Sequence, residues 1–484
     1  MLLPLLEIAQ LALAIPVELA DLLDDNAWPV NGKSPTDKQI IDQTLHTLKT
    51  LYSTNSTNVD NCIRCKTTLD VGKSIALTRP DLVPEIFVKW CTDNKIASAS
   101  TCKTTYSRNS ITASRTGIDF TNMLQLIDPW AIDGDYLCYY KLGECSLPET
   151  PEVDLSSWWP AKNESNASIE YGHDTFPYGQ LASHASGHEN LYSWNDELFA
   201  DLWVGYDWLP FEDYEEVKKH YTGYSVTTKS GIKVIAVNSN SYYQKNYYSY
   251  WNMTENVDTF GTLKFIVDEL IESEAKNEKV WIIAHIPFVD YDALPIQAEA
   301  YKQILTRFAP TTITGLFFGH THQDQFNVLY ANDNKTIDNA ILNTWIDLSV
   351  TPQQDYNPGW RYYEVDKKSK TIMNSYNYYL RLNETFTNHT EPEWLFEYSA
   401  RDSYDVNGEW PKEAPLNATF WATVAEKMKT EKNITQLYSD FSYRLSPYVP
   451  SCDEGDCEDM YCYVSSFSHE QYVNCTASSK IDYE

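Results

Sequence analysis

The sequence predicts an α/β domain of alternating strands and helices, preceded by a small all-α bundle and followed by a helical region. Three observations predict this arrangement. Apolar runs of strand length alternate with amphipathic helical patterns in the middle of the chain. The 10 cysteines fall into two even groups at opposite ends, as expected for two disulfide clusters. The length of 484 residues exceeds one compact domain, so two or three folding units are expected.

The first cysteine group lies in a region with a helical pattern. Residues 39–52, QIIDQTLHTLKTLY, place isoleucine and leucine side chains along one helical stripe. Six cysteines follow: Cys62, Cys65, Cys91, Cys102, Cys138 and Cys145. Six cysteines allow about 15 pairings, so the residues alone leave the connectivity open. A zinc ribbon is the alternative for C-x-x-C, but the spacing to the other cysteines does not suit one.

The middle of the chain alternates buried strands with helices. Strands are predicted over residues 231–240, 280–288 and 313–322, and helices over residues 262–279 and 298–309. Two further strands, expected to be antiparallel, cover residues 359–366 and 371–380. In such a domain the functional loops leave the strand ends. From about residue 414 the pattern is helical again and continues into the second cysteine group.

Composition and sequence signals indicate an extracytoplasmic protein. Lys+Arg of 37 against Asp+Glu of 68 gives a net charge of -31, which argues against nucleic-acid binding. Residues 1–20 contain an apolar run that predicts a signal peptide, with a buried N-terminal helix as the alternative, since Glu7 interrupts the run. We therefore expect a protein that is secreted or located in the vacuole or the cell wall. Ten N-x-S/T sequons predict a glycoprotein: Asn55, Asn163, Asn166, Asn252, Asn334, Asn383, Asn388, Asn417, Asn433 and Asn474.

The sharpest motif is Gly319-His320-Thr321-His322, which follows the apolar residues LFF at the end of a predicted strand. His285 follows WIIA in another predicted strand and precedes Ile286 and Pro287. Glycine lets the backbone turn, so two histidines one residue apart can direct their imidazoles toward a common pocket. Neutral imidazoles at neighbouring strand ends are good ligands for zinc-like ions. We therefore predict that His285, His320 and His322 bind metal.

The chain resembles the acid sphingomyelinase-like branch of the calcineurin-like metallophosphoesterases, in its fungal form. The resemblance rests on SVTTKSGIKVIAVNSNSYYQKNYYSYWN, KVWIIAHIPF, FFGHTHQDQFNVLY and NPGWRYY. It implies a layered β-sandwich flanked by helices over residues 171–400, in which two metal ions, usually zinc, hold a phosphate while a bridging water attacks phosphorus. It also implies that His285 and His320 bind one ion and His322 the other.

His173, in Tyr-Gly-His-Asp-Thr, matches the end of the G-N-H-[DE] motif of this family. The resemblance implies that this histidine stabilises the transition state or protonates the leaving group, and that Asp174 orients its ring. The motif is incomplete, because Gly172 stands where the metal-binding asparagine belongs. A surface turn rich in glycine and proline is the alternative.

Four ligands expected from the family are absent. Its D-x-H and G-D strand ends belong between a Trp-rich linker and G-N-H, but only 14 positions separate Trp159 from His173. A βαβ unit needs about 30 residues, so these strands do not fit there. Gly134-Asp135 lies beside Cys138 in the first cysteine group and is not the missing motif. We therefore expect one zinc ion or none, and exposed edges or apolar faces where strands have lost their neighbours.

The order of the first six cysteines resembles the saposin-like module, here expected over residues 36–148. The resemblance implies a bundle that contacts phospholipid or a membrane surface. It also implies the pairs Cys62–Cys145, Cys65–Cys138 and Cys91–Cys102. A linker over residues 149–170 and a C-terminal helical region over residues 401–484 complete the expected organisation.

An aromatic-rich loop follows the strand predicted over residues 231–240. Tyr242, Tyr243 and Tyr247 could form a wall around a choline group through cation–π attraction. A packed, tyrosine-rich surface loop is the alternative.

The sequence leaves two classes of function open. The first is a secreted, metal-dependent phosphodiesterase that hydrolyses sphingomyelin-type phospholipid to ceramide and phosphocholine, as the resemblance implies. The second is a catalytically inactive lipid-binding glycoprotein, as the absent ligands indicate. A gene model that lacks an internal segment of an active enzyme would also explain the absent ligands.

Overall fold

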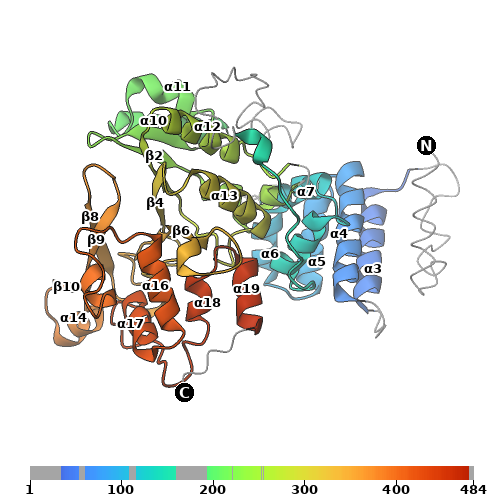
Figure 1. Ribbon diagram of the computed structural model, residues 1–484. Coiled ribbons are helices and arrows are strands. Elements are labelled where there is room, and N and C mark those ends of the chain that lie inside the picture. The colour runs from blue at the N-terminus through green and yellow to red at the C-terminus, as the bar shows by residue number, and fades with distance from the viewer. Residues whose placement is uncertain are drawn as a thin grey trace. The chain divides into compact units, whose positions relative to one another are not determined.

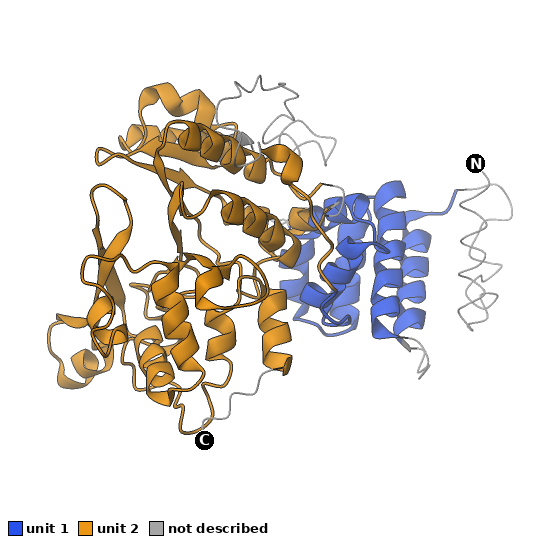
Figure 2. Ribbon diagram, in the orientation of Figure 1, with its two compact units in different colours: residues 1–148 blue, residues 149–484 orange. Residues whose placement is uncertain are grey.

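The computed structural model describes residues 34–53, 60–107, 116–159, 193–220, 222–251, 253 and 256–478. The chain divides into two compact units, Met1–Pro148 and Glu149–Glu484, coloured separately in Figure 2. Within the described residues no helix has the length and apolar character needed to cross a membrane.

The first unit is helical. The helix predicted over residues 39–52 is confirmed, and its Ile41, Leu45 and Leu48 are buried against Leu82 and Ile86. The helices are α3 (Asp37–Ser53), α4 (Asn61–Thr78), α5 (Val83–Asp93), α6 (Ala99–Tyr106), α7 (Thr116–Leu126), α8 (Ile132–Leu137) and the π-helical η1 (Cys138–Leu142).

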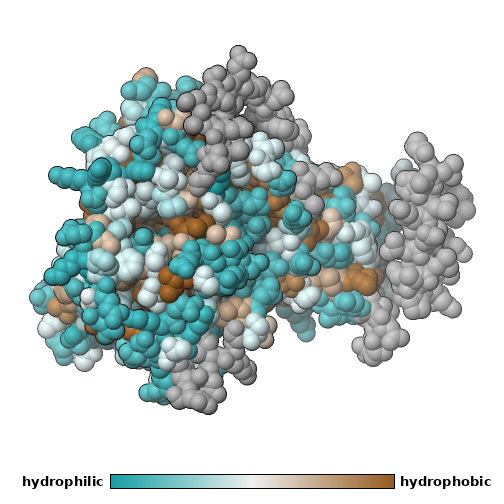
Figure 3. All heavy atoms as spheres, viewed as in Figure 1, coloured by the Kyte–Doolittle hydropathy of each residue, from teal (hydrophilic) through white to brown (hydrophobic). Residues whose placement is uncertain are grey.

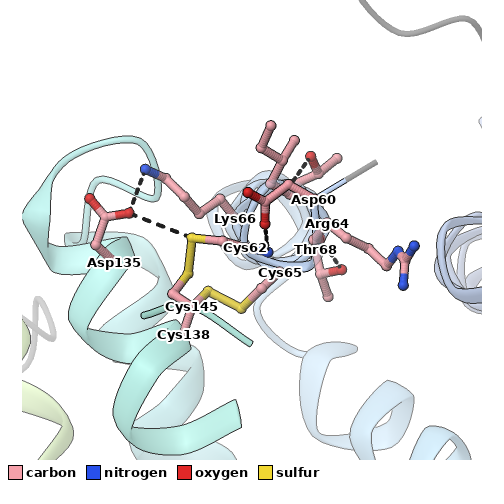
Figure 4. The surroundings of a disulfide bond; sticks show 11 residues. Asp60, Cys62, Arg64, Cys65, Lys66, Thr68, Asp135, Cys138 and Cys145 are labelled. Carbon is pink, nitrogen blue, oxygen red and sulfur yellow. Dashed lines mark hydrogen bonds and ion pairs between the residues drawn. A yellow bond between two sulfur atoms is a disulfide. The ribbon is translucent and has the colours of Figure 1, made fainter. Parts of the chain in front are cut away.

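Three disulfide bonds hold these helices together, and they are the same three pairs that the saposin-like resemblance implies. They join Cys62 to Cys145, Cys65 to Cys138 and Cys91 to Cys102. Beside the first bond, Asp135 forms an ion pair with Lys66 at 2.7 Å (Figure 4). Because the Cys62 and Cys145 sulfurs are bonded to each other, neither offers a thiolate to a metal ion. Asp135 therefore has a structural role here.

The second unit is built around a mixed five-stranded sheet with the order β1-β2-β3-β4-β7. Only β1 and β2 are antiparallel; the other neighbouring pairs are parallel. The predicted alternation of strands and helices is confirmed, although each strand ends before the polar residues that follow it. These elements are β1 (Tyr224–Thr227), β2 (Ile232–Ala236), α12 (Thr262–Ala275), β3 (Lys279–Ile283), α13 (Pro295–Phe308), β4 (Ile313–Phe318) and β7 (Trp345–Ile346).

Both faces of this sheet are covered. Helices α12 and α13 lie against one face (Figure 1), where Val280 and Ile282 of β3 join their apolar core. The alternate residues Trp281 and Ile283 pack into a second core on the opposite face, with residues of the later strands and helices. Successive strand side chains point to opposite faces, so a strand buried on both faces is predominantly apolar. This requirement explains the continuous apolar runs.

The second core is completed by two small sheets and the C-terminal helices. The sheets are β5 (Val328–Tyr330) with β6 (Ala340–Asn343), and β8 (Gly359–Val365), β9 (Ile372–Leu380) and β10 (Trp394–Ser399) in the order β10-β9-β8. The antiparallel strands predicted over residues 359–366 and 371–380 are thereby confirmed.

The remaining helices are α10 (Ser193–Gly205), α11 (Tyr214–Val217), α14 (Leu382–Asn388), α15 (Ala400–Tyr404), α16 (Ala418–Met428), α17 (Lys432–Ser442), α18 (Met460–Val464) and α19 (His469–Ser478). Short helical turns are η2 (Ser156–Trp158), η3 (Phe211–Asp213), η4 (Ser239–Ser241), η5 (Tyr247–Tyr250), η6 (Ile337–Asn339) and η7 (Gln353–Asp355). In the C-terminal region, disulfide bonds join Cys452 to Cys457 and Cys462 to Cys475.

Apolar side chains are exposed near one edge of the main sheet. Strand β1 forms this edge, and α10 and α11 pack against it. Between these helices Tyr206, Trp208 and Phe211 are 68%, 67% and 79% exposed. Elsewhere, on the face drawn in Figure 3, hydrophilic residues predominate and apolar residues form small separate groups.

Candidate metal-binding site

The predicted histidines at two strand ends lie together. His285 follows β3 and His320 follows β4, and these strands are parallel neighbours, so both residues emerge at the same edge of the sheet. The Gly319 N–H donates to the His285 carbonyl at 2.9 Å, which continues the pairing of the two strands. His320 Nδ1 lies 3.2 Å from His285 Nε2.

His322 is close enough to His285 to affect the pKa of the His285 imidazole. Burial lowers the pKa of His285, and the positive charge that His320 and His322 can carry lowers it further. The backbone carbonyl of His322 accepts a 2.7 Å hydrogen bond from Arg444. Its ring Nδ1 is buried and has no hydrogen-bond partner among the residues that the structure describes. A buried ring nitrogen without a partner is an available ligand atom.

The turn after β4 differs from the expected one. Gly319 does not have a positive φ; the left-handed residues are His320 at 71° and His322 at 62°. Such a conformation is uncommon outside glycine, although histidine adopts it more often than most residues, and each instance destabilises the fold by about 1–2 kcal/mol. Strain of this kind concentrates at functional sites, where the surrounding contacts enforce it. The Arg444 hydrogen bond to His322 is one such contact.

Two carboxylates in the loop after β3 lie next to the histidines and were missed from the sequence. His320 Nε2 lies 2.9 Å from Asp292 Oδ2. Asp290 Oδ1 accepts the backbone N–H of Asp292 at 2.8 Å. Burial alone would raise the pKa of Asp292, but hydrogen bonds from His320 and Gln244 outweigh it and lower the pKa to about 2. The D-Y-D sequence shortly after His285 was the available signal, but its spacing matches no metal motif considered above.

The loop after β2 supports the histidines from the other side. Ser239 Oγ accepts the backbone N–H of His285 at 2.7 Å and that of Ile286 at 3.1 Å. Tyr243 is half-buried and its ring meets that of His320 edge-on, with 5.9 Å between centroids. This placement puts Tyr243 at the site.

Tyr242 and Tyr247 do not share that position. Tyr242 is fully buried and donates from its hydroxyl to the Ile286 carbonyl at 2.9 Å, so it belongs to the core. The suggestion that Tyr242 contacts substrate is therefore corrected, because its ring is enclosed by the core and its hydroxyl is already bonded to the protein backbone. Tyr247 is half-buried in η5, apart from the residues that line the pocket described next.

A pocket of about 280 Å³ opens beside the two histidines. It lies beyond the carboxyl ends of β2 and β3, where α/β sheets commonly bind ligands. Its volume is near the lower end for small-molecule pockets and suits a headgroup better than a whole lipid. The pocket is lined by Val237, Asn238, Ser239, Asn240, Tyr243, His285, Ile286 and His320.

The His285–His320 pair has the geometry of two ligands of one ion. Tetrahedral zinc with Zn–N bonds of about 2.0–2.1 Å places its ligand nitrogens about 3.3 Å apart. The observed separation is 3.2 Å. A second possible cluster joins Asp290, Asp292 and His320, whose ligand atoms all lie within 4.8 Å of one another. The donor set therefore fits one divalent ion at this edge of the sheet. The predicted residues His173 and Asp174 lie outside the described residues.

The loop after β3 also contacts a buried histidine, His469, through Tyr291. This histidine should make the free energy of unfolding depend on pH. His469 stacks edge-on against Tyr291 at 5.3 Å, and burial lowers its pKa to about 4. An unfolded histidine titrates near pH 6.5, so the unfolded chain takes up this proton first as the pH falls. Stability should therefore fall by about 3 kcal/mol between pH 6.5 and pH 4 through this one group.

This prediction can be checked by urea unfolding at pH 7 and pH 4. His469→Gln should lose about 3 kcal/mol less than the wild type over this interval, because glutamine has no proton to gain. His46→Gln, at an exposed position of α3, should retain the wild-type dependence. Equal pH dependence in the His469 variant and the wild type would contradict the prediction.

Comparison with known proteins identifies similar phosphodiesterases. The chain is 29% identical to sphingomyelin phosphodiesterase 2 of Caenorhabditis elegans, over 58% of this chain and 46% of that protein. It is 30% identical to sphingomyelin phosphodiesterase B of Dictyostelium discoideum, over 56% of this chain and 42% of that protein. It is 28% identical to the mouse cyclic GMP-AMP phosphodiesterase SMPDL3A, over 63% of this chain and 66% of that protein. The chain spans about half the length of the two sphingomyelin phosphodiesterases. No family model matches it.

Proposed function

The chain belongs to the acid sphingomyelinase-like family, and on this premise we propose that it is a metal-dependent phosphodiesterase that hydrolyses sphingomyelin-type phospholipid to ceramide and phosphocholine. The observation that carries the proposal is the 3.2 Å approach of His285 Nε2 to His320 Nδ1 beside an open pocket. Two neutral imidazoles at this distance fit one zinc-like ion.

His285 and His320 would hold the ion. The Nδ1 of His322, which has no hydrogen-bond partner among the described residues, is available as a third ligand atom. When bound, the ion would polarise a phosphoryl oxygen and lower the pKa of a water molecule. The chain's own residues have supporting tasks. Ser239 holds the backbone of His285, Arg444 holds that of His322, and Tyr243 forms a wall of the pocket. His173 would supply the proton for the leaving group.

The choice of a lipid substrate rests on the first unit. We propose that residues 36–148 form a saposin-like module that contacts a phospholipid surface. Helix α4 exposes Ile63 and Leu77, and the turn after α5 exposes Ile96; these side chains are 45%, 59% and 63% exposed. Apolar side chains on the surface of a disulfide-linked bundle can enter a lipid interface. The similar proteins named above act on sphingomyelin or on cyclic GMP-AMP, and both substrates are phosphodiesters.

We further propose that the second unit is a metallophosphoesterase domain and that the protein is a secreted glycoprotein. Five disulfide bonds and 10 sequons support an oxidising compartment. An extracellular, vacuolar or cell-wall location fits these features, and zinc is the expected ion.

A non-catalytic lipid-binding glycoprotein is the second candidate. The observation that favours it is the absence of D-x-H from the sequence, together with Gly172 in place of asparagine. A two-ion site without its bridging carboxylate does not form, so catalysis here would depend on one ion. Sequencing the transcript across the codons for residues 159–173 would also reveal whether an internal segment encoding the missing ligands exists.

The test is phosphocholine release from sphingomyelin vesicles by the full chain, with Zn²⁺ and with EDTA. We expect Zn²⁺-dependent release that His285→Ala and His320→Ala each lower at least about 100-fold, because each removes a metal ligand. His46→Ala, at an exposed position of α3, is the matched control and should keep wild-type activity. Absence of release above the EDTA background, with cyclic GMP-AMP also unreacted, would support the non-catalytic alternative and overturn the proposal.

A further inference from the structure

The two ring nitrogens of His320 face different partners. Nδ1 faces His285 Nε2 at 3.2 Å, on the side of the pocket. Nε2 faces Asp292 Oδ2 at 2.9 Å, on the side of the loop after β3. A carboxylate can only accept a hydrogen bond, so a neutral His320 carries its hydrogen on Nε2. Its Nδ1 lone pair is then directed toward His285.

Asp292 is itself held in place by three further contacts. Its Oδ1 accepts from Gln244 Nε2 at 2.6 Å, and its Oδ2 lies 3.4 Å from the Lys245 ammonium. Its backbone N–H donates to Asp290 at 2.8 Å. The side chain is only 15% exposed. The carboxylate therefore has one well-defined orientation, with Oδ2 toward the imidazole.

We propose that Asp292 is a positioning residue that fixes His320 in the Nε2–H tautomer, so that His320 Nδ1 and His285 Nε2 together bind one divalent ion. Metal-binding histidines commonly donate their other ring N–H to a carboxylate, which fixes the ring and raises the basicity of the ligand nitrogen. This inference rests on the proposed metal-dependent function. Asp292 lies in the loop after β3. It would orient a metal ligand in a site that lacks the carboxylate ligands expected from the family.

The competing arrangement places the ion among Asp290, Asp292 and His320 Nε2. The contacts around Asp292 disfavour it. Both carboxylate oxygens of Asp292 already accept from Gln244 or His320, and the Lys245 ammonium beside Oδ2 would repel a cation there. An ion in that position would also leave His285 without any part in binding.

A metal titration of the full chain separates the two arrangements. Co²⁺ is the probe, followed through its visible absorption, with Zn²⁺ in competition. Asp292→Asn should weaken Co²⁺ binding about 10–100-fold, the usual effect of removing such a carboxylate. His285→Ala should weaken it at least as much, because a ligand is lost. Asp290→Asn is the matched control: its amide oxygen can still accept from the Asp292 N–H, and Co²⁺ binding should change by less than about threefold.

The tautomer of His320 gives a readout that a merely structural role would not change. Nitrogen-15 NMR of the metal-free protein should show hydrogen on Nε2 of His320 in the wild type, and a mixture of tautomers in Asp292→Asn. Gln244→Met, which frees Oδ1 of Asp292, should weaken Co²⁺ binding several-fold and provides a second variant if Asp292→Asn does not fold.

Equal losses in Asp290→Asn and Asp292→Asn, or unchanged Co²⁺ binding in His285→Ala, would overturn the inference, as would a wild type that binds no Co²⁺. The expected order of affinities would support the inference even if no vesicle substrate were hydrolysed. That combination would count against the proposed activity alone.

Discussion

Replacing Arg361 by methionine is expected to destabilise the second unit by about 3–5 kcal/mol, because it leaves the buried Asp324 carboxylate without its counter-charge. Arg361 on β8 forms an ion pair with Asp324, and the two side chains are only 3% and 7% exposed. Asp324 also accepts hydrogen bonds from Asn377 and, at 2.6 Å, from the Tyr398 hydroxyl. Burial alone would lower the pKa of Arg361, but the negative charge of Asp324 outweighs it and raises the pKa.

The position of Asp324 gives this network a role in the site. Asp324 lies two residues after His322, and its backbone carbonyl accepts from Ser442 of α17 at 3.0 Å. The carboxylate thus ties the end of the histidine turn to β8, β9 and β10 through Arg361, Asn377 and Tyr398. The loss of Arg361 should therefore loosen the turn that carries His320 and His322, in addition to lowering stability.

Urea unfolding of the full chain checks this prediction. Arg361→Lys keeps the charge but not the planar hydrogen-bonding group, and should cost less than Arg361→Met. The double variant Arg361→Met with Asp324→Asn should recover part of the loss, because the remaining carboxylate no longer needs a counter-charge. A loss below about 1 kcal/mol in Arg361→Met would show that the pair is not a significant source of stability.

Gly134→Ala is expected to destabilise the first unit by about 3 kcal/mol, at the high end for overpacked positions. A methyl group at Gly134 would lie 2.0 Å from the carbonyl oxygen and 2.5 Å from the carbonyl carbon of Pro129. These are backbone atoms, so relief requires movement of α8 or of the turn that precedes it. Helix α8 leads directly into Cys138, which is bonded to Cys65, and this bond limits such movement.

Hydrogen exchange of peptides from the first unit, measured in the full chain, reports the expected loss of protection. Gly143→Ala is the matched control in the same unit. No atom of the described residues lies within 4 Å of a methyl group added at Gly143, but the φ of Gly143 is +64°. Its substitution should cost only about 1 kcal/mol, from the left-handed backbone. Equal protection in the Gly134 and Gly143 variants would mean that the Pro129 contact is easily relieved.

The sequence by itself determined the order of the elements. The apolar runs at β2, β3 and β4 predicted strands because a strand covered on both faces is predominantly apolar. The histidines were found for a related reason: His285 and His320 stand just after those runs, and the ends of parallel strands share one edge. These signals are local in sequence, so they can be recognised from the sequence alone.

Only the tertiary structure decided which other residues reach the site. Asp292 and His320 are 28 positions apart, and Arg444 and His322 are 122 apart. Loop residues have no periodicity that gives their direction, so the sequence could not distinguish the buried Tyr242 from Tyr243 at the pocket. The strained φ values at His320 and His322, in place of a turn at Gly319, are imposed by distant contacts such as the Arg444 hydrogen bond. Local patterns determine secondary structure, whereas side-chain direction and backbone strain depend on packing between distant segments.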